Sequence, residues 1–166
     1  GFLMNGSMDA FAFSVGKTNY FGVAGSEPNL FAARKRPASN MAPVLVTDGD
    51  GVAAAIGTPG GPTIPTTLAS ILLAVEAHGW DPADSVRRAR LHHQGWPDVL
   101  YREERSPGAD VLAKLARMGY SIEEKNEPIG DVHALFRCGG EYTAVSDNRR
   151  EGRAVGFDGR NKGGRE

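Results

Sequence analysis

The sequence predicts an α+β domain in which helices and strands form packed layers. Three observations predict it: a β-branched hairpin over residues 43–56, an amphipathic helical stripe over residues 64–75, and short strand-like apolar runs after residue 119. At 166 residues the chain is long enough for one domain with a sizeable core. Its 22 glycines and 10 prolines indicate many turns.

Strand signals come first along the chain. Residues 1–4 are apolar and are predicted to lie in the middle of a strand, so we expect this chain to be a piece of a longer protein. Residues 43–47 form a β-branched run, residues 48–51 read Asp-Gly-Asp-Gly, and residues 52–56 return as a second apolar run. This pattern predicts a β-hairpin.

Three helices are predicted next. The first carries an apolar stripe on one face and ends at Gly79. The stripe consists of Ile64, Leu68, Ile71, Leu72 and Val75. Asp81 is predicted to cap a short helix that begins at Pro82 and runs to about Arg88.

The same pairing of a capping residue and proline recurs at Ser106 and Pro107, which predicts a third helix that ends at Gly119. Its apolar residues, predicted to face the core, are Val111, Leu112 and Leu115. The later apolar runs predict strands at residues 120–124, 132–137 and 142–146. The last twenty residues are rich in Arg and Gly and are predicted to be loosely held, with a flexible tail at 158–166.

Charge and cysteine content exclude several classes of partner and site. A net charge of −1 without a basic helix face argues against a nucleic-acid partner. No stretch approaches the roughly 20 apolar residues of a membrane span. Cys138 has no partner for a disulfide within the chain and is predicted to be a small buried apolar residue. The compartment, whether periplasmic, extracellular or cytoplasmic, therefore stays open.

The run Gly57-Thr58-Pro59-Gly60-Gly61-Pro62-Thr63 connects a predicted strand to a predicted helix. Glycines let a ligand approach the backbone closely, and a helix start offers unpaired N–H groups. Such a turn stabilises a negative oxygen, either of a phosphate or of an acyl-transfer intermediate. A phosphate loop needs Lys and then Ser or Thr after its last glycine, which this run lacks, so we favour an oxyanion hole over a phosphate site or a plain turn.

Other candidate residues are interpreted as structural. The adjacent His92 and His93 cannot both face one metal ion from a regular element, and His133 is predicted to be a packed strand residue. The turn at residues 48–51 lacks the Glu that completes a calcium loop. We therefore predict neither a metal nor another cofactor. Lys35 and Arg36 either attract an anionic substrate or solvate a loop.

Four segments occur in a fixed order along the chain. They are Asn-Gly-Ser-Met-Asp-Ala-Phe at residues 5–11, Lys-Arg-Pro-Ala-Ser-Asn-Met-Ala-Pro at 35–43, Gly-Thr-Pro-Gly-Gly at 57–61 and Arg-Leu-His-His-Gln at 90–94. The series resembles the small, C-terminal subunit of the gamma-glutamyltransferases, whose patterns are approximately Leu-Asn-Asn-x-Met-Asp-Asp-Phe, Lys-Arg-Pro-x-Ser-Ser-Met-x-Pro, Gly-Ser-Pro-Gly-Gly and Arg-x-His-His-Gln. Order and rough spacing agree over residues 1–157, which would form one small-subunit portion.

The resemblance implies an N-terminal-nucleophile hydrolase fold, a four-layer αββα sandwich of which this chain supplies part. In that family a precursor cuts itself, and the freed N-terminal Thr attacks a γ-glutamyl amide to form an acyl-enzyme. Gly1 has no side chain and cannot be this nucleophile, so the chain alone is expected to be inactive. The implied partners are the large subunit of the same precursor and a small amide substrate, with higher oligomers left open.

The resemblance also assigns site residues by position. Gly60 and Gly61 match the glycines whose N–H groups form the oxyanion hole. Ser39 and Asn40 match two serines that bind the substrate carboxylate, with Asn in place of the second Ser. Ser7 and Asp9 lie in the substrate-binding loop.

Position 10 departs from the family. There Ala10 replaces an Asp that pairs with the α-ammonium of the glutamyl group, and on an extended loop the neighbouring Asp9 would face the other way. An unpaired ammonium in a dry pocket costs about 3 to 5 kcal/mol. We therefore expect weak activity on γ-glutamyl donors and better tolerance of glutaryl amides, the direction taken by cephalosporin acylases. A non-catalytic scaffold or ligand-binding relative is the alternative from another class.

Overall fold

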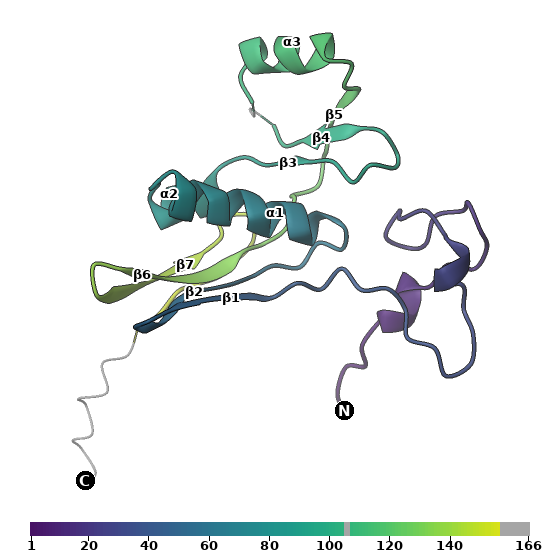
Figure 1. Ribbon diagram of the computed structural model, residues 1–166, viewed down its shortest axis with the longest axis horizontal. Helices are drawn as coiled ribbons and strands as arrows, with labels where there is room; N and C mark the ends of the chain where they lie inside the picture. Colours follow the sequence, from purple (N-terminus) through teal and green to yellow (C-terminus); the bar gives the residue numbers. More distant parts are fainter. Residues whose placement is uncertain (105–106, 157–166) are drawn as a thin grey trace.

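The computed structural model describes residues 1–104 and 107–156, arranged as Figure 1 shows. A four-stranded antiparallel sheet, in the order β1-β2-β6-β7, forms its main layer. The strands are β1 (Val44–Asp48), β2 (Gly51–Gly57), β6 (His133–Cys138) and β7 (Glu141–Ser146). Helices α1 and α2 lie across one face of this sheet, so the predicted α+β organisation is confirmed.

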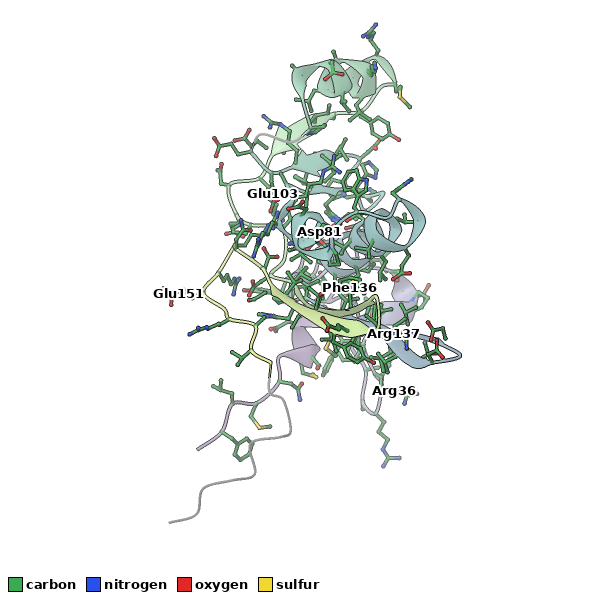
Figure 2. The ribbon with its side chains drawn as sticks, turned by 90° about the vertical axis from the view of Figure 1, so that its left-hand side faces the viewer. Arg36, Asp81, Glu103, Phe136, Arg137 and Glu151 are labelled. Carbon is green, nitrogen blue, oxygen red and sulfur yellow. The ribbon has the colours of Figure 1, made fainter. Side chains whose placement is uncertain are left out.

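The hairpin of β1 and β2 forms where the sequence predicts it. Asp48 pairs with Gly51 across the turn, and the Asp48 carboxylate accepts the N–H of Asp50 at 2.9 Å. Arg137, labelled on β6 in Figure 2, donates to the Asp48 carboxylate and, at 2.8 Å, to the Asp50 carbonyl. The tip of the hairpin is thus held by local turn chemistry and by a side chain from another strand.

Helix α1 (Thr63–Leu72) continues through a π-helical turn at Leu73–Ala77 and buries the predicted apolar stripe against the sheet. Removing one such side chain typically costs about 2 to 5 kcal/mol, because the cavity relaxes only partly. Figure 2 labels Phe136, a 1% exposed member of the core on β6. The core comprises Ala54, Ile56, Ile64, Leu68, Ile71, Val86, Val132, Ala134, Phe136 and Val145.

Helix α2 (Pro82–Arg87) begins as predicted. The Asp81 side chain accepts the N–H groups of Ala83 and Asp84 at 2.8 and 3.0 Å, satisfying two donors of the first turn. Pro82 occupies the first helical position, where its missing N–H costs nothing. Val86 then enters the core and attaches α2 to the sheet.

A second, three-stranded sheet was not fully anticipated. It consists of β3 (Leu91–His92), β4 (Leu100–Arg102) and β5 (Ile122–Glu124), with β4 and β5 parallel. The sequence predicts β5 but not β3 or β4, because strands of two and three residues carry almost no periodic signal. α3 (Ala109–Arg117) lies on the crossover from β4 to β5 (Figure 1).

Two expectations about α3 are wrong. Its N-cap is Gly108 rather than Ser106, a residue outside the described ranges. Of the three apolar residues predicted to face the core, Val111 is 38% exposed and Leu112 and Leu115 are only half-buried. The helix stands on the small sheet away from the main core, which explains why its apolar side is not buried there (Figure 1).

The first 43 residues form an irregular segment beside the sheet (Figure 1), with short 3-10 turns at Ser7–Ala10 and Glu27–Asn29. The strand predicted for residues 1–4 is wrong: these residues are exposed and pair with no strand among the described residues. Within this segment Phe11 is 1% exposed and packs edge-on against Phe31 at 5.3 Å between ring centroids.

Three single-residue expectations also fail. Cys138 is exposed, because it ends β6 just before the tight turn to β7. His133 is exposed as well, on the side of β6 that faces away from the helices. Arg149 belongs to a buried cluster rather than to a loose C-terminal segment. The predicted tail at 158–166 lies outside the described residues, and no described helix is long and apolar enough to cross a membrane.

Candidate active site

The glycine turn lies between β2 and α1, as predicted. Gly60 and Gly61 have φ angles of +140° and +57°, which L side chains adopt at a cost. Their carbonyls accept the N–H groups of Thr63 and Ile64 at 3.2 and 3.1 Å. Their own N–H groups donate to no group within residues 1–104 and 107–156. Both donors are therefore available to a ligand.

Neighbouring atoms crowd both positions. A Cβ on Gly60 would lie 2.4 Å from the Thr63 hydroxyl, and one on Gly61 would lie 3.0 Å from the Phe21 ring. The first distance is shorter than any real Cβ contact, and the second is tight enough that the Phe21 ring would have to shift. The N-terminal segment therefore reaches the turn through Phe21. At Gly60 both the positive φ angle and the lack of space for a Cβ require glycine.

The segment 129–131, which precedes β6, supports this turn. Asp131 donates its N–H to the Thr58 hydroxyl at 2.8 Å, and Arg90 donates Nη1 to the Ile129 carbonyl at 2.6 Å. A Cβ on Gly130 would approach the Thr58 hydroxyl to 2.7 Å. Arg90 belongs to one of the four sequence segments, so its position connects that segment with the glycine turn.

A buried ion cluster holds Arg90 in place. Its Nη2 donates to Asp147 at 2.6 Å and to the Val86 carbonyl at 2.7 Å. Arg149 bridges Asp147, at 2.8 Å, and Glu103, which Figure 2 labels in the interior between the small sheet and the helices. Two cations and two carboxylates thus balance within the cluster, as buried charges require.

The protonation states follow from this pairing. Burial alone would raise the pKa of Asp147, but hydrogen bonds from the Val132 N–H and the two guanidinium groups bring it below its usual range. Burial and the bonds from Arg149 act on Glu103 in the same way, and its pKa is also lowered. The pKa of Arg90 is lowered by burial, and that of Arg149 is raised because its carboxylate bonds outweigh burial.

His92 is a buried link between α1 and the N-terminal segment. Its Nδ1 lies 2.8 Å from the Thr66 hydroxyl, and its Nε2 lies 2.9 Å from Gln94 Oε1. Gln94 donates its amide to the Gly22 carbonyl at 3.2 Å, so its oxygen faces His92 and Nε2 carries the proton. Burial lowers the pKa of His92, which favours the neutral ring. This structural role agrees with the sequence interpretation.

The structure joins the two loops expected to bind substrate. Asn29 donates Nδ2 to the Ala10 carbonyl at 2.8 Å and accepts the Ala38 N–H at 2.8 Å. Asn19 donates to the same Ala10 carbonyl at 3.1 Å and accepts the Phe21 N–H at 3.0 Å. The loop around Ala10 is therefore tied both to the loop of Ser39 and to the segment that meets Gly61.

The predicted substrate-binding side chains lie at the surface of these loops. Ser39 is exposed, and its hydroxyl accepts the Met41 N–H at 3.2 Å. Asn40 is half-buried, whereas Ser7 and Asp9 are exposed on the first 3-10 turn. Among the described residues no hydrogen bond joins Ser39 or Asp9 to Gly60 or Gly61, and their loops connect to the glycine turn only indirectly, through Asn29 and Asn19.

Sequence reasoning missed most of the ion cluster. Only Arg90 lies in a motif, while Glu103, Asp147 and Arg149 stand among other charged residues and give no separate signal. Asn19 and Asn29 were missed as well, since an isolated asparagine in a loop is usually a turn former. A surface hollow beside Trp80 and Arg88 lies elsewhere, on α2, and takes no part in the glycine turn.

Comparison with known sequences matches residues 1–157 to the gamma-glutamyltranspeptidase family model. The chain is 37% identical over 159 residues to a glutathione hydrolase proenzyme of Pseudomonas aeruginosa, covering 95% of this chain and 28% of that protein. It is 32% identical over 150 residues to the Escherichia coli glutathione hydrolase proenzyme, covering 90% and 26%. The chain thus spans little more than a quarter of the length of these two proenzymes.

Solved structures give the complementary result. A gamma-glutamyltranspeptidase from Pseudomonas nitroreducens complexed with L-DON superposes with a TM-score of 0.87 at 34% identity, over 95% of this chain and 83% of that chain. The T380A mutant of the Helicobacter pylori enzyme gives 0.83 at 34% identity, over 90% and 82%. A cephalosporin acylase from Bacillus halodurans, 20% identical with a TM-score of 0.70, shares the fold.

The two gamma-glutamyltranspeptidase chains are close to this one in extent, whereas the proenzymes are several times longer. The match therefore falls on one of the separate chains of a processed enzyme. It also confirms the N-terminal-nucleophile hydrolase fold expected from the sequence motifs. The chain belongs to the gamma-glutamyltranspeptidase family and corresponds to its small subunit.

Proposed function

We propose that this chain is the small subunit of an amidohydrolase that cleaves γ-glutamyl or glutaryl amides through an acyl-enzyme. The observation that carries the proposal is the pair of unengaged N–H groups at Gly60 and Gly61, on the strand-to-helix turn of a chain from this family. Glutathione, named in the relatives' glutathione hydrolase activity, is one such γ-glutamyl amide.

The reaction assigns separate roles to the parts of the site. A Thr hydroxyl from a part of the protein outside this sequence attacks the amide carbonyl, and its α-amine takes the proton because that amine is partly neutral at pH 7. The carbonyl oxygen becomes negative and accepts the N–H groups of Gly60 and Gly61. The intermediate collapses, and the amine of the substrate leaves with the proton returned by the Thr α-amine. Water or an acceptor amine, deprotonated by the same α-amine, then attacks the ester of the acyl-enzyme and releases the Thr hydroxyl.

Substrate binding is assigned to the neighbouring loops. Ser39 and Asn40 would donate hydrogen bonds to the carboxylate of the acyl donor, with Asn40 supplying an amide N–H where the family pattern has a hydroxyl. Ser7 and Asp9 would line the end of the site that receives the donor's α-carbon. Residues Ser7–Ala10 form a 3-10 turn rather than the extended loop assumed from the sequence, but with three residues per turn the side chains of Asp9 and Ala10 still point in different directions. Ala10 offers no charge to an ammonium on its own side of the turn, which favours glutaryl donors.

A large subunit from the same precursor is the proposed partner. The face of the main sheet opposite α1 and α2 carries an apolar row across all four strands, in which Leu45 pairs with Ala55, Ala55 with Leu135, and Leu135 with Ala144. Leu45 is 70% exposed, and Phe2 in the N-terminal segment is 86% exposed. Apolar surface of this extent is typical of a face that another chain covers.

The test uses the complete protein that contains this chain. Mass spectrometry establishes whether it matures into two chains, and release of nitroaniline from γ-glutamyl and glutaryl nitroanilides measures its activity. We expect two chains and a higher kcat/KM for the glutaryl compound. A strong preference for the γ-glutamyl compound would refute the role given to Ala10. An uncut protein that is inactive on both would support a binding or scaffold role instead.

A further inference from the structure

Each oxyanion donor at the glycine turn shares a peptide plane with a carbonyl that a threonine hydroxyl holds. The Pro59 carbonyl, in the plane of the Gly60 N–H, accepts the Thr58 hydroxyl at 2.8 Å. The Gly60 carbonyl, in the plane of the Gly61 N–H, accepts the Thr63 hydroxyl at 3.0 Å. In a planar trans peptide the C=O and N–H bonds point in opposite directions, so fixing the oxygen also fixes the N–H.

The direction of the Thr58 hydrogen bond is unambiguous. The Asp131 N–H donates to the Thr58 oxygen at 2.8 Å and cannot accept a proton in return. The single hydroxyl proton therefore goes to the Pro59 carbonyl. The backbone of the segment before β6 thereby sets the orientation of the hydroxyl, and the hydroxyl sets the orientation of the Pro59–Gly60 peptide.

Thr63 acts on the next peptide from inside the core. It is only 4% exposed, and both its hydroxyl and its N–H donate to the Gly60 carbonyl, at 3.0 and 3.2 Å. Two donors on one oxygen restrict rotation of the Gly60–Gly61 peptide more than one donor would. Thr63 is also the first residue of α1, which packs on the main sheet, so the restraint is anchored to the rigid part of the fold.

The two hydroxyls occupy space that glycines leave empty. A Cβ on Gly60 would lie 2.4 Å from the Thr63 hydroxyl, and a Cβ on Gly130 would lie 2.7 Å from the Thr58 hydroxyl. The glycines and threonines therefore fit together as two pairs. Gly130 has no place in the proposed reaction, yet its missing side chain makes room for the hydroxyl that orients the turn.

We propose that Thr58 and Thr63 are positioning residues that aim the Gly60 and Gly61 N–H groups at the developing oxyanion. This role rests on the proposed acyl-transfer function. Both threonines act through backbone carbonyls and never touch the substrate. Their loss changes the direction of the donors, so it weakens stabilisation of the transition state more than binding of the ground state.

The experiment compares Thr58→Val and Thr63→Val, which keep the shape of the side chain, with Thr58→Ser and Thr63→Ser, which keep the hydroxyl. All are measured on protein whose cleavage into two chains has been verified by mass spectrometry, using whichever nitroanilide the unaltered protein hydrolyses. We expect each valine variant to lose about 10- to 100-fold in kcat, the scale of misplaced catalytic groups, with KM changed less than threefold. The serine variants should stay within threefold in kcat.

Ser70→Ala serves as the matched control, because the Ser70 hydroxyl also donates to a backbone carbonyl of α1, that of Thr67 at 2.9 Å, but lies away from the turn. It should keep the kcat of the unaltered protein. Equal kcat values for valine and serine variants would overturn the proposal, as would a loss expressed mainly in KM. If a valine variant does not mature, the serine variant at the same position decides the test. A loss of more than tenfold in its kcat overturns the proposal, and a retained kcat supports the proposal.

Failure of the underlying function gives a different result. An unaltered, mature protein that releases no nitroaniline from either donor refutes the acyl-transfer function itself. An active unaltered protein with fully active valine variants refutes only the role of the threonines.

Discussion

Arg90 and Asp147 form an ion pair of 2.6 Å in which both side chains are almost completely closed to water, at 3% and 0% exposure. Arg90 comes from the segment that follows α2, and Asp147 follows the last residue of β7. The pair therefore joins the helix layer to the far edge of the main sheet. Through the Ile129 carbonyl, Arg90 also holds the segment that supports the glycine turn.

We expect Asp147→Asn to lower the free energy of unfolding by about 3 to 5 kcal/mol, because it leaves Arg90 and Arg149 with a single buried carboxylate. Urea denaturation followed by tryptophan fluorescence measures the loss. The matched control is Asp48→Asn, which breaks an exposed Asp–Arg pair on the hairpin and should leave the urea midpoint almost unchanged. Equal losses of stability in the two variants would show that breaking the buried Asp147 pair costs no more than breaking the exposed pair.

The pH dependence of stability should carry the signature of the same carboxylate. The pKa of Asp147 is lower in the folded protein than its unfolded value of about 3.9, so its contribution is complete above that pH and is lost as the pH falls through the folded pKa. Urea midpoints measured from pH 7 to pH 2 should show a steep acid loss that Asp147→Asn reduces only below about pH 4.

His92 provides an internal check on that series. Burial lowers its pKa, so its stabilising effect is lost as the pH falls below the unfolded value of about 6.5. The loss of stability as the pH falls below about 6.5 should therefore persist in Asp147→Asn. If the urea midpoint of Asp147→Asn falls as steeply below about pH 4 as that of the unaltered protein, the loss of stability in acid does not come from Asp147.

Asn29 should control donor binding through the two loops that it joins. Asn29→Ala removes the bonds to the Ala10 carbonyl and the Ala38 N–H, each worth about 1 kcal/mol, and so loosens the loops proposed to hold the substrate. We expect the donor KM to rise about tenfold with a smaller change in kcat. Asn126→Ala, at an exposed asparagine beyond β5, is the control and should leave both constants unchanged. A fall in kcat alone would place Asn29 with the chemistry instead.

Restoring the family's acidic residue should reverse the proposed substrate preference. In Ala10→Asp a carboxylate returns to the loop held by Asn19 and Asn29, where it can pair with a donor α-ammonium. We expect the ratio of kcat/KM for γ-glutamyl over glutaryl nitroanilide to rise at least tenfold, on the scale of a charge-assisted hydrogen bond of about 1.5 to 3 kcal/mol. Ala10→Asn, similar in size but uncharged, should leave the ratio near its starting value. An equal rise in both variants would exclude a charge effect.

Features that depend on neighbouring residues could be predicted well. The hairpin of β1 and β2, the stripe on α1, the cap at Asp81 and the glycine turn all form within short stretches, where turn chemistry and helical periodicity act directly. The prediction of a strand at residues 1–4 was wrong, because a strand also needs a partner strand to pair with. Apolar character in a short stretch does not supply that partner.

The sequence by itself determined the order of the main elements, the family and the location of the glycine turn, since local backbone preferences and motif spacing carry that information. Only the tertiary structure decided which charged residues are buried, which loops Asn29 joins and which hydroxyls hold the glycine turn. Arg90 and Asp147 are 57 residues apart, and a charge destined for the interior looks the same in a sequence as one that stays in water. Burial is a property of the packed layers, so it appears only when distant segments meet.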